Sequence, residues 1–123
     1  MSRESFADPR PTVVEQQGSY VLEGGSCIEC GHATVRLTRR CPRCGAPTEP
    51  ATFGPAGTVW ASTTVHVPTP ERPDPYTLAY VDLESGPRLL AHVASSVTPL
   101  AVGTPIGLVG STEAGDPCVE VRS

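Results

Sequence analysis

Residues 27–45, CIECGHATVRLTRRCPRCG, contain two Cys-x-x-Cys pairs that are separated by ten residues. Two residues between cysteines allow one tight turn to direct both sulfurs at a single ion, and the glycine after each pair permits the left-handed backbone that turns amides toward sulfur. The four thiolates of Cys27, Cys30, Cys41 and Cys44 would complete a tetrahedral shell with no open position for water. The spacing therefore predicts a structural Zn²⁺ site without a catalytic role.

An iron site is the alternative for the same four cysteines. Residues 41–45, CPRCG, also resemble the second half-site of rubredoxin, which would imply electron transfer. Rubredoxin-like chains separate their half-sites by a longer insert with aromatic residues that shield the iron, whereas the insert here is short and has none. The pattern favours a structural zinc ion that stabilises a ribbon too small to fold without metal.

The regions around this ribbon differ in composition. Residues 1–18 are polar and interrupted by proline, so we expect a flexible arm there. Residues 19–50 hold the paired cysteines and form the predicted zinc ribbon, while residues 54–123 form a predicted barrel. The start of the chain lacks the apolar run of a secretory signal, and no segment approaches membrane-spanning length. We therefore expect a cytoplasmic protein without membrane contact, in which cysteines bind metal and do not form disulfides.

Alternation of apolar and polar residues follows the ribbon and predicts short strands. In residues 57–67 the alternation places Val59, Ala61, Thr63, Val65 and Val67 on one face and Trp60, Ser62, Thr64 and His66 on the other. Residues 68–75, PTPERPDP, are expected to form a loop because four of the eight residues lack an amide donor. The strands expected are 57–67, 76–84, 88–95, 105–110 and 118–122.

Five short strands in this length favour a closed barrel, which leaves no exposed edge. We therefore predict a mostly β protein in which the N-terminal zinc ribbon precedes a small five-stranded OB-fold barrel. A small SH3-like barrel is the structural alternative.

Charge argues against nucleic-acid binding without excluding it. The net charge is −4, and all nine basic residues are arginines. Nucleic-acid binding requires a positive field or a strong basic stripe. One local cluster, formed by Arg36, Arg39, Arg40 and Arg43, keeps that alternative open.

The remaining reactive side chains do not form a recognisable catalytic set. Cys118 lies in the last predicted strand, where a free cysteine is usually a small packed hydrophobe. His66 and His92 also lie on predicted strands, without the local sequence of a nucleophile and its base. We therefore expect no catalytic activity from the chain alone.

Several motifs in order carry a family resemblance. Leu22-Glu23-Gly24 precedes the two cysteine pairs, and residues 57–66, GTVWASTTVH, follow them. Residues 76–83, 86–88, 91–93 and 102–106 continue the match. Together these motifs resemble the zinc-ribbon/OB-fold family formerly filed as domain of unknown function 35.

The resemblance implies a partner role. Members of that family accompany thiolase-superfamily enzymes that act on acyl-CoA, including thiolases, acyltransferases and side-chain aldolases, and the larger subunit holds the catalytic residues. On this basis we expect a non-catalytic accessory subunit that binds and stabilises a thiolase-fold enzyme. Acyl-CoA is expected at the shared interface.

Two departures from the family pattern concern the contacts. The lead-in at residues 15–20 is too short and glycine-broken for the aromatic N-terminal helix common in the family. The proline-rich segment usual between the cysteine pairs is replaced by residues 34–40, TVRLTRR, whose arginines could meet an acidic partner surface or the phosphates of coenzyme A. The candidate contacts with CoA or partner are Arg36, Arg39, Arg40, Trp60 and His66.

The alternative function is an OB-fold nucleic-acid-binding module with a structural zinc ribbon. In that case Trp60, Tyr76 and Tyr80 would stack on bases, and the ribbon arginines would contact the phosphate backbone. The acidic net charge and the small number of aromatic residues weigh against it.

Overall fold

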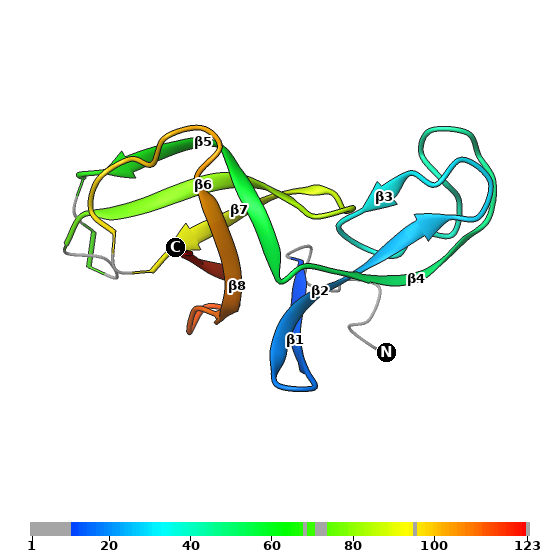
Figure 1. The fold of residues 1–123 in the computed structure, drawn as a ribbon, viewed down its shortest axis with the longest axis horizontal. Helices are drawn as coiled ribbons and strands as arrows, with labels where there is room; N and C mark the ends of the chain where they lie inside the picture. Colours follow the sequence, from blue (N-terminus) through cyan, green and yellow to red (C-terminus); the bar gives the residue numbers. More distant parts are fainter. Residues whose placement is uncertain (1–10, 68, 71–73, 95, 123) are drawn as a thin grey trace.

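The computed structural model describes residues 11–67, 69–70, 74–94 and 96–122, and within these ranges it contains strands and no helix (Figure 1). A four-stranded ribbon sheet comprises β1 (Thr12–Gln16), β2 (Ser19–Cys27), β3 (Ala33–Thr34) and β4 (Thr48–Phe53). A five-stranded barrel comprises β5 (Ala56–Val65), β6 (Tyr76–Leu83), β7 (Arg88–Val93), β8 (Pro105–Ser111) and β9 (Pro117–Val121). The mostly β class, with a ribbon followed by a barrel, is confirmed.

The barrel strands follow the order β5-β6-β7-β9-β8, and pairing of β5 with β8 closes the cylinder. All neighbours are antiparallel except β7 and β9, which are parallel at His92 and Val93. Each barrel strand overlaps one of the five predicted from the sequence. Of the predicted proline loop, residues 68 and 71–73 lie outside the described part of the chain.

The predicted alternation along β5 is wrong after its first half, because a β-bulge lies between Val59 and Ala61. A bulge adds one residue to one strand and therefore reverses the faces beyond it. Ala61 and Thr63 lie opposite Tyr80 and Leu78 on the outer face, on the same side as Trp60.

The same reversal turns Ser62 and Thr64 toward the barrel interior. Ser62 Oγ accepts a hydrogen bond from the amide of Leu100 at 2.7 Å, and Thr64 and Thr77 hydroxyls are 2.8 Å apart. These bonds satisfy polar groups that would otherwise be costly to bury. This end of the barrel is therefore closed by hydrogen-bonded hydroxyls.

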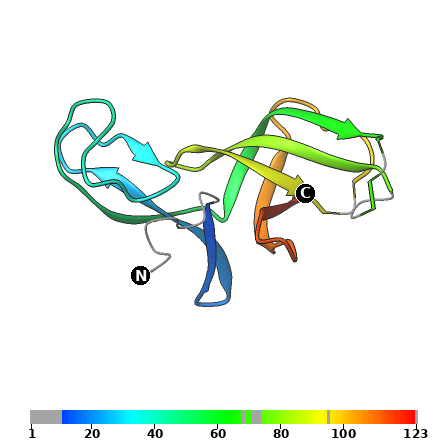
Figure 2. The same cartoon turned by 180° about the vertical axis from the view of Figure 1, so that it is seen from behind.

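The ribbon sheet is centred on β2, which pairs with β1, β3 and β4 (Figure 2). The predicted flexible arm is wrong for Thr12–Gln16, which forms β1 and pairs along its full length with β2. The polar composition of this segment suits a strand that exposes one face to water. Residues 1–10 lie outside the described part of the chain.

The ribbon and the barrel share one hydrophobic core. Leu22 of β2 and Phe53 of β4 belong to the same buried cluster as the inward residues of the barrel, such as Val81 and Ile106. In both views the β6–β7 turn extends toward the ribbon sheet (Figures 1 and 2). An added Cβ on Gly86 in this turn would lie 2.7–2.8 Å from three atoms of Phe53, so the two parts pack directly against each other.

The described part of the chain contains no helix that could span a membrane.

Candidate metal centre

Two similar turns bring the four paired cysteines together at the end of the ribbon. Cys27 is the last residue of β2, and the amide of Gly31 donates to its carbonyl at 3.1 Å. Cys41 accepts from the amide of Gly45 in the same way at 2.8 Å. Both glycines have a positive φ, 76° and 81°, which an L side chain rarely adopts. The glycine that follows each pair is therefore required by the turn.

The sulfur positions are suited to one metal ion. All four Sγ atoms lie within 4.8 Å of one another. Cys27 and Cys44 sulfurs are 3.5 Å apart, and Cys30 and Cys41 sulfurs are 3.8 Å apart. A tetrahedral site with metal–sulfur bonds of about 2.3 Å has sulfur–sulfur edges of about 3.8 Å. The four cysteines therefore form a cluster that could hold a metal ion with a full tetrahedral shell.

Backbone amides are directed at the buried sulfur of each turn. The amides of Glu29 and Cys30 donate to Cys27 Sγ at 3.3 Å, and the amide of Arg43 donates to Cys41 Sγ at 3.3 Å. The amide of Cys30 is the largest influence on Cys27, and with the other donors it lowers the pKa of that thiol to about 6, although burial acts in the opposite direction. Such bonds stabilise the thiolate, which is the form that binds metal.

The fourth thiol shows how a bound cation would stabilise the cluster. The amide near Ala46 lowers the pKa of Cys44, but the thiol of Cys27 and desolvation outweigh it and raise the pKa to about 12. Nearby sulfurs resist carrying negative charge together. A bound divalent cation removes that repulsion, so the donor set fits a metal such as zinc.

The fifth cysteine lies in the barrel. Cys118 is partly buried in β9, where it pairs with His92 of β7 in the parallel register. Burial, followed by the nearby charge of Glu120, raises the pKa of its thiol. A raised pKa is the opposite of what a reactive thiolate requires.

The ribbon arginines lie between the two cysteine pairs or within the second pair in the sequence, and they face solvent. Residues 30–48 contain four arginines and no acidic residue, in a chain whose net charge is −4. Arg36, Arg39, Arg40 and Arg43 are all exposed. Arg40 donates to the carbonyl of Gly45 at 3.3 Å, and none of the four has a carboxylate partner within the described ranges. Their charge is therefore available to another molecule.

The structure separates the two barrel candidates, Trp60 and His66. The ring of Trp60 meets Tyr80 edge to face, with centroids 6.0 Å apart, and the Arg88 guanidinium lies 3.9 Å from the Trp60 ring centre. His66 follows the end of β5 and is exposed. The bulge after Val59 breaks the alternation that would have placed His66 on the face of Trp60.

Sequence reasoning did not identify Leu90 and Arg88 as neighbours of Trp60 and Tyr80. They lie on β7, with Leu90 opposite Tyr80 and Arg88 opposite Asp82. A signal was available in the sequence of β6. Its residues 76–81, YTLAYV, are apolar on both faces of the strand except for the threonine, which indicates an outer face with apolar neighbours.

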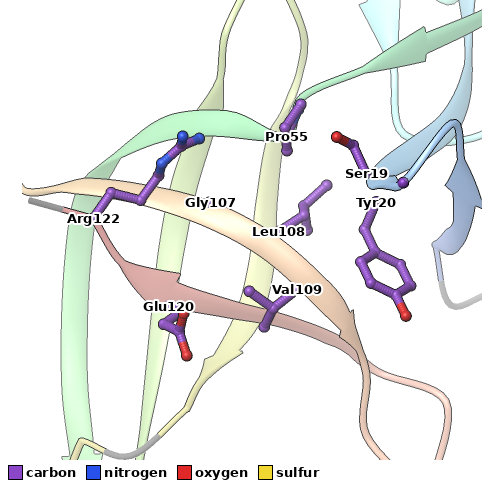
Figure 3. Close-up of a pocket in the computed structure, with 9 residues that line it drawn as sticks. Ser19, Tyr20, Pro55, Gly107, Leu108, Val109, Glu120 and Arg122 are labelled. Atoms are coloured by element: carbon purple, nitrogen blue, oxygen red, sulfur yellow. The ribbon is translucent and has the colours of Figure 1, made fainter.

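A separate hollow of about 310 Å³ lies between the β1–β2 turn and the outer side of β8 and β9 (Figure 3). Tyr20 lines one side of it. Glu120 of β9 and Arg122, which follows the end of that strand, extend in opposite directions on the other side. The two charged groups have opposite sign, so this hollow does not form a dedicated anion site.

Comparison with known proteins identifies relatives of this architecture. Residues 51–110 match the family model described as the C-terminal OB-fold domain of ChsH2. A solved chain of the Ltp2-ChsH2(DUF35) aldolase aligns with a TM-score of 0.65 and 24% identity, covering 85% of this chain and 86% of that chain. A DUF35-family protein of unknown function from Sulfolobus solfataricus aligns with a TM-score of 0.59 and 20% identity, covering 81% and 75% respectively. The family resemblance drawn from the sequence is confirmed, and the structural matches establish the fold.

Proposed function

We propose, from the premise that residues 51–110 belong to the ChsH2 C-terminal OB-fold family, that this chain is a non-catalytic accessory subunit of an enzyme complex. Its partner would be a thiolase-fold enzyme, such as a thiolase, acyltransferase or aldolase, that acts on acyl-CoA or a related acyl thioester. The observation that carries the proposal is the family match. A similar solved chain belongs to the Ltp2-ChsH2(DUF35) aldolase, which supports a role beside a partner enzyme. We place this function in the cytoplasm.

The chemistry of the chain supports a role without catalysis. Its four clustered thiols would be consumed by the metal shell, which leaves no ligand position for substrate. The remaining thiol, that of Cys118, has a raised pKa. The nucleophile and base of the acyl-transfer step would then belong to the partner enzyme.

We assign Zn²⁺ to the cysteine cluster as a structural ion. Bound zinc would supply the cross-link between the two turns and no reaction step. Amide donors to Cys27 and Cys41 support this assignment, since they stabilise the thiolate form. Metal analysis of the purified chain tests it, because a red, redox-active protein with one iron per chain would overturn zinc.

The exposed ribbon arginines are the proposed contacts for anionic groups. Arg36, Arg39 and Arg40 would meet either an acidic surface of the partner or the phosphates of acyl-CoA held at the shared interface. Trp60 and His66 remain proposed contacts on the barrel side. Acyl-CoA affinity of the complex, compared between the wild type and charge-reversed arginine variants, distinguishes the two sources of negative charge.

Co-expression with a thiolase-fold enzyme from the same gene neighbourhood tests the central proposal. We expect the two chains to co-purify at a fixed ratio, and we expect the enzyme to lose solubility or activity when produced alone. A partner that is fully active and soluble by itself, and never co-purifies with this chain, would refute the accessory role.

Nucleic-acid binding is the second candidate, favoured by the OB-fold barrel and the four exposed arginines. The surroundings of Trp60 weigh against it, because the guanidinium of Arg88 covers the indole and is itself paired with Asp82 at 2.7 Å. Titration of labelled single strands at several salt concentrations tests this candidate. Absence of binding at low salt removes it.

A further inference from the structure

Strand β6 is apolar on both of its faces. Ala79, Val81 and Leu83 point into the barrel and are almost fully buried. The alternate residues Leu78 and Tyr80 point outward. The outer side of a small barrel is usually polar, whereas strands with two apolar faces are typical of sheets covered on both sides. The sequence of β6 therefore suggests that something covers its outer face.

The neighbouring strands extend the same apolar surface. Tyr80 lies opposite Ala61 of β5 and Leu90 of β7, and Leu78 lies opposite Thr63. We name this surface the outer β5–β6–β7 face, and its members are Trp60, Ala61, Thr63, Leu78, Tyr80 and Leu90. Its three largest side chains are half exposed: Trp60 at 47%, Tyr80 at 46% and Leu90 at 45%. Adjacent large apolar groups of this kind mark interaction sites.

A hollow lies within this face. It has a volume of about 320 Å³ and is lined by five members of the face together with Ser62. The lining is predominantly apolar, and the hollow is wide enough for one aliphatic or aromatic side chain.

Aromatic and charged contacts order the rim of the face, which consists of Trp60, Tyr80 and Arg88. Trp60 packs edge to face with Tyr80, and Arg88 lies over the indole. Two hydrogen bonds, of 2.7 and 3.2 Å, join the Arg88 guanidinium to the Asp82 carboxylate. Side chains that are already ordered lose less conformational entropy on binding. The rim is therefore prepared for a partner before contact.

The charged groups at this face lie beside partners. The Arg88 guanidinium and the Asp82 carboxylate form a bidentate pair at one end, and the imidazole of His92 lies 3.6 Å from the carboxylate of Asp116 at the other. A phosphate backbone or an acidic surface would find no unpaired cation on the face. A matching occupant must be uncharged and apolar.

We propose that the outer β5–β6–β7 face is the surface on which the partner protein docks, with one apolar side chain of the partner in the hollow. This inference rests on the proposed accessory function and adds the location and chemistry of the contact. The face spans three strands and presents three large, half-exposed side chains around an apolar hollow, which suits the anchored centre of a protein interface. The ribbon arginines lie outside it and would contribute separately.

The test uses the complex co-expressed with the thiolase-fold enzyme. Tyr80→Asp and Leu90→Asp place a charge on the face, and Val109→Asp is the matched control on β8, where the valine is 38% exposed. We expect each face variant to weaken binding about 30-fold or more, as loss of an interface anchor does, and the control to bind as wild type. Tyr80→Phe should retain binding, since it keeps the apolar ring.

Folding of each variant is checked by its zinc content and thermal midpoint, which should match those of the control. If Leu90→Asp does not fold, Leu90→Ala and Tyr80→Ala replace the charged variants. Wild-type binding by well-folded Tyr80→Asp and Leu90→Asp would overturn the docking face and leave the accessory function intact. Failure of the wild-type chain itself to bind would overturn both.

Two further outcomes would reassign the face. Sedimentation of the free chain compares wild type with Leu90→Asp: a wild-type dimer that this change dissociates would identify a second copy as the occupant. Binding of a labelled single-stranded oligonucleotide that Tyr80→Asp abolishes would identify nucleic acid. Either result overturns docking of a partner enzyme there.

Discussion

Replacing Gly86 by alanine should loosen the junction between ribbon and barrel. A Cβ at this position would lie 2.7 Å from Cγ of Phe53 and 2.8 Å from its Cβ and Cδ1. Carbon atoms in contact normally stay about 3.5–4.0 Å apart, so one part must move by roughly 1 Å. Phe53 is buried in the shared core and cannot move into solvent without exposing it. Overpacking of this kind lowers the free energy of unfolding by about 1–3 kcal/mol.

Urea unfolding of the metal-loaded chain, followed by the fluorescence of its single tryptophan, measures this cost. For a protein with an m-value of about 2 kcal/mol per molar urea, we expect the midpoint to fall by about 1 M. Gly107→Ala is the matched control: its Cβ would lie 2.8 Å from Cδ of Arg122, but that side chain is exposed and free to move. The control should change stability by less than about 0.5 kcal/mol.

A compensating change distinguishes steric contact from other effects. Phe53→Ala removes two of the three atoms that the new Cβ would meet, Cγ and Cδ1, so Gly86→Ala should cost less in that background, with an interaction energy of at least about 0.5 kcal/mol. Equal midpoints for wild type and Gly86→Ala would refute direct packing of the β6–β7 turn on β4.

The remaining predictions concern the metal, the lone thiol and the arginines. Cys41→Ser should lose the bound metal and with it the ribbon and partner binding, while far-ultraviolet circular dichroism still detects the barrel; a metal-free variant that binds the partner normally contradicts this. Cys118→Ser should leave the activity of the complex within about twofold, because the thiol is partly buried with a raised pKa, and an inactive complex would show that it has a working role. Reversing Arg36, Arg39 and Arg40 to glutamate should slow association with the partner enzyme about tenfold at low salt and much less at high salt, as measured by stopped-flow mixing; equal rates would argue against electrostatic attraction.

Local sequence was sufficient for the metal cluster and for the barrel strands. The Cys-x-x-Cys-Gly pattern describes a turn whose geometry depends on neighbouring residues, and both turns have the positive φ glycine that it implies. The barrel strands are bounded by proline and glycine, which interrupt pairing for steric reasons that also act locally. These features therefore appear in the structure where the sequence predicts them.

Other features had no signal in the apolar pattern or depended on contacts between distant residues. Strand β1 has few apolar residues, so alternation did not reveal its pairing with β2 across the tight turn at Gln17 and Gly18, which both have positive φ. The bulge after Val59 reversed the faces of β5, because side-chain direction beyond a bulge depends on the register with β6. The pairing of Trp60 with Tyr80 and Arg88 follows from that register.

The amino-acid sequence by itself determined the four cysteines that cluster, the order of the barrel strands along the chain and the local charge of residues 30–48, which hold four arginines and no acidic residue. These properties depend on composition and on spacings of a few residues, over which backbone geometry is nearly fixed. Only the tertiary structure decided that Phe53 of the ribbon packs against Gly86 in the β6–β7 turn. It also decided that an apolar face forms around Tyr80 and Leu90. Both arise from strand register and barrel closure, because packing between segments far apart in the chain has no local signature.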